Sequence, residues 1–259
     1  VPKGYKNTLK VTRKVGTNKV IITGNSPLGT SGIKEWISVT DPTAYSLDVF
    51  KKSLAEKGIT FTAASKVVQG KVPVNAKALA SRKSMELKDL MIPFMKLSNN
   101  THAEVLAKEM GKVIHDEGSW KAGLLVMNEY ALSIGLDASK WTFEDASGMS
   151  YSNKVTSSQL SKLLYLVRLE PWYPIYSKSL PVAGSSDRLI GGTLKNRLKA
   201  SPARGNVTAK TGSLKNIKSL AGYAKTKSGE TLIFTVLTEK NKSSTIPVID
   251  QIATTIANY

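Results

Sequence analysis

The 259-residue sequence contains no cysteine. Without a thiol the chain can form no disulfide bond, no thiolate nucleophile and no cysteine-ligated zinc or iron–sulfur site. Histidine is almost as scarce. His102 and His115 are the only two, and their separation of 13 residues does not match the i, i+4 spacing with which a helix presents two metal ligands. We therefore expect no metal site and no bound cofactor.

Long apolar runs are also missing. No stretch approaches the roughly 18 apolar residues that cross a bilayer, and no basic segment followed by an apolar core opens the chain. The C-terminal residues place Ile246, Ile249, Ile252 and Ile256 on one helical stripe. Because the opposite face lacks the lysine-rich character of an interfacial helix, this stripe is expected to pack into a core.

Acidic residues are few, with 19 Asp and Glu against 37 Lys and Arg, so the formal net charge is +18. The basic residues are spread along the chain, and only six are arginine, the side chain that clamps phosphates and guanine edges bidentately. This pattern indicates a generally basic surface and makes nucleic acid an unfavoured partner. It also suits an enzyme that works among anionic wall polymers, and composition does not choose between these interpretations.

The first 80 residues predict a small α/β unit. Short runs rich in β-branched residues suggest strands over 7–13, 17–23, 34–40 and 59–66. Between the last two, Asp41-Pro42 is a helix-start signal, and the following apolar residues recur at helical spacing until Gly58.

From residue 84 the periodicity is helical for most of a hundred residues. It predicts a helix over 85–97 interrupted by Pro93, one capped by Thr101-x-x-Glu104, and others over 119–134 and 156–168. The chain then changes to strands over 207–211, 217–226 and 231–238, followed by a helix over 245–258. Helices between an early β-rich unit and a late antiparallel hairpin predict an α+β architecture.

Two short motifs lie 112 residues apart: Ser98-Asn99-Asn100, before a predicted helix, and Lys210-Thr211-Gly212, on a predicted strand. Each is weak alone, but a Ser-x-Asn loop facing a Lys-Thr-Gly strand is the frame of the penicillin-recognising serine enzymes. Further segments resemble the low-molecular-mass, class C penicillin-binding D-alanyl-D-alanine carboxypeptidases: residues 95–104, 145–150, 179–184, 205–214 and 219–223. The chain departs from that family at Ala146, where glycine is usual, and in a longer link over 185–191.

The resemblance implies a penicillin-binding, β-lactamase-like transpeptidase domain, an antiparallel sheet flanked by helices. It further implies that residues 1–80 are the C-terminal part of an inserted accessory domain, and that residues 81–259 are the C-terminal part of the peptidase domain. Such enzymes need a nucleophilic serine with a lysine one helical turn later. The only Ser-x-x-Lys here is Ser31–Lys34, which precedes a predicted strand. We therefore expect the catalytic pair to lie outside this chain, and the chain alone to be inactive.

The resemblance also implies roles. The absent serine would attack the carbonyl between two D-alanines of a peptidoglycan stem peptide, and Ser98 would relay a proton to the leaving amine. Asn100 would hydrogen-bond the substrate amide and Lys210 would supply positive charge. Thr211 would bind the substrate carboxylate, Gly212 would admit the substrate backbone, and the Ser213 N–H would be half of the oxyanion hole. β-Lactams are the implied covalent inhibitors, and the implied location is extracytoplasmic, in or near a bacterial wall.

Alternatives remain open from the residues alone. Tyr151-Ser152-Asn153 is a tyrosine version of the first motif, closer to Lys210 in the sequence. A different class of function is a non-catalytic wall-binding module that keeps the fold without the nucleophile. Carboxypeptidase and endopeptidase action on stem peptides are not distinguished.

Overall fold

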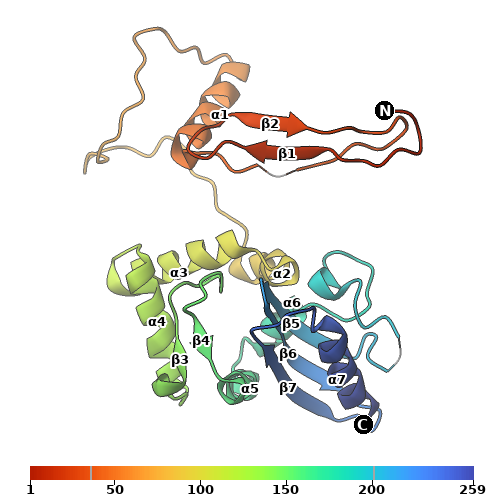
Figure 1. The fold of residues 1–259 in the computed structure, drawn as a ribbon. Coiled ribbons are helices and arrows are strands. Elements are labelled where there is room, and N and C mark those ends of the chain that lie inside the picture. The colour runs from red at the N-terminus through yellow and green to blue at the C-terminus, as the bar shows by residue number, and fades with distance from the viewer. Residues whose placement is uncertain (36, 201) are drawn as a thin grey trace. The chain divides into compact units, whose positions relative to one another are not determined.

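The computed structural model describes residues 1–35, 37–200 and 202–259 (Figure 1). The chain forms two compact units, Val1–Ala80 and Ser81–Tyr259. Among the described residues, no helix is both long enough and apolar enough to span a membrane.

The described part of the first unit contains one hairpin and one helix. Strand β1 (Lys10–Arg13) pairs antiparallel with β2 (Val20–Thr23). Helix α1 (Pro42–Glu56) begins where the sequence predicts, because the Asp41 carboxylate accepts a hydrogen bond from the Ala44 N–H at 2.9 Å.

Two predicted strands of this unit are wrong. Residue 36 lies outside the described residues, and the described part of 34–40 contains no strand. Residues 59–66 instead include a turn in which the Ser65 N–H donates to the Thr62 carbonyl at 3.0 Å. β-branched residues favour a strand only when a neighbouring strand completes the hydrogen-bond ladder, and the described part of this unit offers none here.

The second unit begins with helices, of which all but Tyr173–Ser179 are predicted from the sequence. They are α2 (Leu87–Leu97), α3 (Asn100–His115), α4 (Trp120–Ser133), α5 (Ser157–Leu166) and α6 (Tyr173–Ser179). Short turns of 3-10 helix cover Ala138–Lys140, Val167–Leu169 and Gly192–Leu194. Two short strands that the sequence does not predict, β3 (Trp141–Thr142) and β4 (Lys154–Val155), pair antiparallel.

Two details of these helices differ from the prediction. Helix α2 continues through Pro93, whose fixed φ is helical, so that the proline removes one hydrogen bond without ending the helix. Helix α3 is capped by Asn99, whose side chain accepts from the His102 N–H at 3.0 Å, and not by Thr101. The Glu104 carboxylate of the predicted capping box instead accepts from the Ser147 N–H at 2.9 Å.

A three-stranded antiparallel sheet follows, in the order β5 (Val207–Leu214), β6 (Ile217–Lys225) and β7 (Thr231–Thr238). Strand β5 is longer than predicted because Leu214 pairs with Ile217, which leaves a two-residue turn with Asn216 at φ 60°. Asparagine is one of the few residues with a Cβ that tolerate this left-handed conformation.

Helices cover both faces of the sheet (Figure 1). On one face Leu220 and Phe234 pack with Ile249 of helix α7 (Ile246–Asn258) in the main apolar core. On the other, Tyr223 packs with Leu164 of α5. The C-terminal helix therefore packs into a core as expected, although its buried stripe is Ile249, Ala253 and Ala257, and Ile252 is exposed. The α+β fold with an antiparallel sheet flanked by helices is confirmed.

Candidate active site

The fold brings the two sequence motifs into contact. The Lys210 Nζ donates a hydrogen bond to the Ser98 Oγ at 2.6 Å and another to the Thr211 carbonyl at 2.8 Å. Ser98 follows α2, whereas Lys210 lies within β5. A serine and a lysine separated by 112 residues thus form one polar pair.

Ser98 has an unusual backbone. It ends α2 in the left-handed conformation, with φ 53° and ψ 56°. This conformation destabilises a residue with a Cβ by roughly 1–2 kcal/mol, and such strain is concentrated at functional sites. The conformation lets the Asn99 N–H reach the Phe94 carbonyl at 3.0 Å, which closes α2 and starts α3 almost at once.

Lys210 is largely removed from water, and this burial lowers its pKa to about 8. Burial disfavours the ammonium because the charge loses its hydration. Near neutral pH Lys210 is therefore still mostly protonated, and it can both donate hydrogen bonds and exchange a proton in the range where an enzyme works.

The two asparagines of the first motif have different environments. The Asn99 side chain is used by the cap of α3. Asn100 is the first residue of α3 and is exposed, and in the described structure its amide has no protein partner. An amide that both donates and accepts is suited to binding another amide.

The second half of β5 has an open edge. On the side away from β6, the Ala183 N–H donates to the Val207 carbonyl at 2.9 Å and the Ala209 N–H to the Pro181 carbonyl at 3.0 Å. Beyond Ala209, the described residues provide no further strand on this side. Because backbone groups alternate between the two edges of a strand, the N–H of Ser213 faces the same open edge as that of Ala209.

The side chains along this edge are polar. Thr211 Oγ1 donates to Thr193 Oγ1 at 2.8 Å, and the exposed Ser213 hydroxyl accepts from Lys218 Nζ. Gly212 pairs with Ser219, and a Cβ at Gly212 would lie 2.3 Å from the Ser219 Oγ. The edge can therefore accept an extended peptide by strand addition, with Lys210 and Thr211 available to a carboxylate.

In the alternative motif, Tyr151-Ser152-Asn153, the asparagine side chain is hydrogen-bonded to neighbouring residues. The Asn153 Nδ2 donates to Asp145 Oδ1 at 3.0 Å and to the Ser150 carbonyl at 3.1 Å, and its Oδ1 accepts from the Glu144 N–H at 2.8 Å. Because these bonds shape the 145–153 turn, the amide of Asn153 is not free to bind a ligand.

The remaining candidates from the sequence are the Ser31–Lys34 pair and the two histidines, and in the described structure none of them joins the polar site. Ser31 and Lys34 lie in exposed chain without helix, so the lysine is not held one helical turn after the serine. His115 Nε2 contacts Glu129 Oε2 at 3.2 Å, and the His102 ring packs edge-on against Phe94. Within the described residues, no group of three or more His, Asp or Glu side chains could hold a metal ion.

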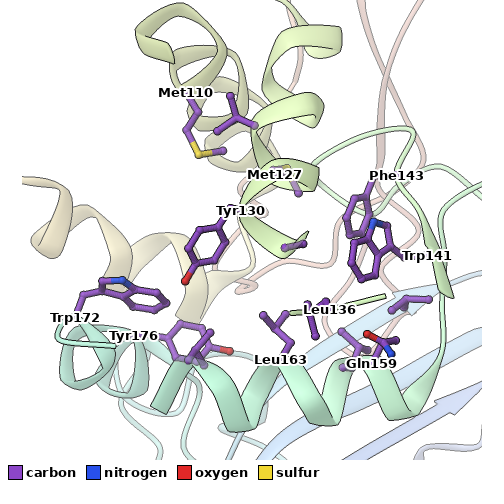
Figure 2. Close-up of a pocket in the computed structure, with 15 residues that line it drawn as sticks. Met110, Met127, Tyr130, Leu136, Trp141, Phe143, Gln159, Leu163, Trp172 and Tyr176 are labelled. Atoms are coloured by element: carbon purple, nitrogen blue, oxygen red, sulfur yellow. The ribbon is translucent and has the colours of Figure 1, made fainter. Parts of the chain in front are cut away.

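A separate cavity of about 450 Å³ lies among the helices of the second unit (Figure 2). Its wall is almost wholly apolar, with the stacked rings of Trp141 and Phe143 at one end and Trp172 and Tyr176 at the other. The other lining residues are Met110, Val126, Met127, Tyr130, Ala131, Leu136, Val155, Gln159, Leu160, Leu163 and Val167. None of the motif residues lines this cavity, so it is distinct from the polar site.

Some residues of the polar site carry no motif signal. Thr193 is distant from both motifs in the sequence, and the packing of residues 180–194 between α2 and β5 brings it beside Thr211. Lys96 lies in the segment 95–104, but its contact with the Leu180 carbonyl is a tertiary one. The sequence gives no sign of either contact, because both join residues that are far apart in the chain.

Comparisons with known proteins find relatives along nearly the whole chain. The chain is 37% identical over 259 residues to a D-alanyl-D-alanine carboxypeptidase of Actinomadura sp. (strain R39), covering 99% of this chain and 48% of the relative. It is 30% identical over 201 residues to the D-alanyl-D-alanine carboxypeptidase DacB of Haemophilus influenzae, covering 76% and 40%. The chain thus spans about half the length of these relatives or less.

Among solved structures, penicillin binding protein 4 of Haemophilus influenzae, complexed with a β-lactam, matches with a TM-score of 0.76 at 24% identity. The match covers 98% of this chain and 59% of that one, and it supports the fold. The model of the D-Ala-D-Ala carboxypeptidase 3 (S13) family matches residues 3–259. The chain therefore belongs to the D-Ala-D-Ala carboxypeptidase 3 (S13) family.

Proposed function

We propose that this chain supplies half of the active site of a serine-type D-Ala-D-Ala carboxypeptidase that acts on peptidoglycan stem peptides through an acyl-enzyme. The observation that carries the proposal is the hydrogen bond from Lys210 to Ser98, formed beside the open edge of β5. It joins a proton-transferring hydroxyl, a cation and a strand edge at the place where a peptide with a terminal carboxylate would lie.

The proposed roles follow from these positions. The stem peptide adds to the edge of β5, and its terminal carboxylate pairs with Lys210 and the Thr211 hydroxyl. Gly212 leaves room for the peptide backbone and Asn100 hydrogen-bonds a substrate amide. The Ser213 N–H stabilises the carbonyl oxygen as it becomes an oxyanion.

The reaction has two steps. A serine hydroxyl attacks the carbonyl carbon of the penultimate D-alanine and gives its proton to the lysine one helical turn after it, both residues lying outside this chain. The C–N bond breaks, and the leaving amine takes a proton through Ser98, which is in turn reprotonated from the Lys210 ammonium or solvent. Water then attacks the ester and releases the shortened peptide. The same steps on a cross-linked stem would be endopeptidase action.

The nucleophile is proposed to come from outside these 259 residues. Ser31–Lys34 is the only Ser-x-x-Lys of the chain, and it lies in exposed, non-helical structure. We accordingly propose that the chain alone is not acylated, and that residues 1–80 belong to an accessory domain inserted in the complete enzyme. The basic surface suits an extracytoplasmic location among anionic wall polymers.

A fluorescent penicillin tests this function. The complete protein should form a covalent, denaturation-resistant band, and the 259-residue chain should form none. Replacing Lys210 with alanine in the complete protein should slow labelling by roughly 100-fold, whereas Ser31→Ala should leave it unchanged.

Two outcomes would contradict the proposal. Labelling of the 259-residue chain that Ser31→Ala abolishes would place the nucleophile within it. A complete protein that binds isolated wall polymer but neither forms the band nor releases D-alanine would be the non-catalytic wall-binding module.

A further inference from the structure

Lys96 is a buried lysine without a role in the chemistry above. It lies on α2, two residues before Ser98, and the residue is 3% exposed. Its Nζ donates to the backbone carbonyl of Leu180, its one partner among the described residues. A lysine is almost never fully buried, because the ammonium loses its hydration. Burial indeed lowers the pKa of Lys96.

The partner of Lys96 leads directly to the strand that holds Lys210. Leu180 is followed by Pro181, whose carbonyl accepts from the Ala209 N–H at 3.0 Å. Ala209 is the residue before Lys210 in β5. The Lys96 side chain therefore ties α2, which ends at Ser98, to a segment hydrogen-bonded to β5 next to Lys210.

The backbone of Lys96 makes a second connection. Gly192 has φ +51°, and a Cβ built there would lie 2.2 Å from the Lys96 carbonyl oxygen, so α2 and the Gly192–Leu194 turn approach more closely than any other residue would allow. The next residue, Thr193, is hydrogen-bonded to Thr211 of β5. Residue 96 is thus in contact with the 180–194 segment through both its side chain and its main chain.

We propose that Lys96 is a positioning residue that sets the separation between Ser98 and Lys210. The two groups lie on different elements, and the links through Leu180 and Gly192 fix the end of α2 relative to β5. The importance of this separation for catalysis rests on the proposed function. A displacement of about 1 Å in such a site can cost on the order of 100-fold in rate.

Lys96→Met is the principal test variant. Methionine has nearly the length of lysine but donates no hydrogen bond, and replacing a buried charge with an apolar group of similar volume is often tolerated. Gly192→Ala disturbs the same junction from the other side. The matched control is Lys162→Met, because Lys162 also donates to a single backbone carbonyl, that of Gly135 at 2.6 Å, but does not connect α2 with β5.

The first readout needs no activity. The NMR shift of the Lys210 side chain is titrated with pH in the lysine-labelled 259-residue chain and assigned with Lys210→Arg. In the parent chain and in Lys162→Met the midpoint should be about 8. In Lys96→Met and Gly192→Ala it should rise by about one unit toward the ordinary lysine value, because Lys210 gains water when the contact loosens. An unchanged midpoint in folded Lys96→Met overturns the proposal.

The second readout uses the complete protein. The acylation rate constant with penicillin should fall 10- to 100-fold in Lys96→Met, with noncovalent affinity within about twofold. If acylation and noncovalent binding instead fall together, in proportion to the folded fraction of Lys96→Met, the role of Lys96 is merely structural and the proposal is overturned. If the unmodified complete protein is not acylated, the proposed function fails, and the Lys210 titration still decides the role of Lys96.

Discussion

Ser98 combines a proposed chemical role with a strained backbone. Its φ of 53° is costly for any residue with a Cβ. The strain is tolerated because the turn at Ser98 ends α2 and leads to the cap of α3 at the next residue. In this conformation the Ser98 hydroxyl accepts a hydrogen bond from Lys210. At this position, unlike in a helix, glycine is the residue that the backbone favours.

We expect Ser98→Gly to be more stable than Ser98→Ala by about 1 kcal/mol, because both variants lose the hydroxyl but only alanine keeps the strain. Urea unfolding of the 259-residue chain measures the difference. At Ser158, an exposed residue of α5, the order should reverse, with glycine less stable than alanine by roughly 0.5–1 kcal/mol. Equal stability of the two Ser98 variants would argue against the left-handed conformation.

The burial of Lys210 makes stability depend on pH. Its folded-state pKa of about 8 lies below the unfolded value of ~10.4. Between these values the unfolded chain binds more protons, so this group raises stability as pH rises from 8 to 10.4, and its destabilising effect is complete below pH 8. Relative to Lys210→Met, the parent chain should gain up to about 3 kcal/mol between pH 7 and pH 10.5. Denaturant unfolding at both pH values tests this, and a constant difference would contradict it.

At the scale of elements, the contact between α3 and α4 depends on two glycines. A Cβ at Gly123 would lie 2.2 Å from the Ala107 carbonyl oxygen, and one at Gly111 would lie 2.7 Å from the Gly123 backbone nitrogen. The two helices therefore approach at backbone distance. This pair helps to hold α3, whose first turn carries Asn100, in place.

We expect Gly123→Ala to destabilise the second unit by about 1–3 kcal/mol, because overpacking outweighs the gain in helix propensity. Thermal unfolding of the chain measures the effect. Gly118→Ala is the control, since a Cβ there would make only ordinary contacts, 3.8 Å from the nearest side-chain atom. An unchanged thermal unfolding midpoint in Gly123→Ala would mean that α3 and α4 can move apart without loss of stability.

The starts of most helices could be predicted from local sequence. Asp41, Ser119 and Thr156 each cap the helix that follows them, because a capping side chain acts within three residues of its own position. The sequence predicts Thr101 as the cap of α3, and the structure has Asn99 instead, because the strained conformation of Ser98 has no local signal.

At the scale of the whole molecule, the two compact units are joined by exposed chain. Residues 57–86 contain no helix or strand and are exposed throughout. They include the basic residues Lys57, Lys66, Lys71, Lys77, Arg82 and Lys83. Exposed backbone outside secondary structure is the preferred site of proteolytic cleavage.

Limited trypsin digestion should therefore first yield a fragment that begins between residues 58 and 84 and ends at Tyr259. Mass spectrometry identifies its ends. Lysines on helices of the second unit, such as Lys112, provide the internal control, since they are exposed but their backbone is hydrogen-bonded. Initial cleavage within α3 or α4 would contradict the division into units.

The sequence alone determined the α+β class, most helices, the three C-terminal strands and the motif residues Ser98, Asn100 and Lys210, because periodicity, caps and motifs are local patterns. It was wrong on strands at 34–40 and 59–66, whose formation requires a partner elsewhere in the chain. Only the tertiary structure decided that Ser98 and Lys210 touch, that burial shifts Lys210, and that Lys96 joins their elements. These properties depend on contacts between residues far apart in sequence and on the exclusion of water, which no local pattern encodes.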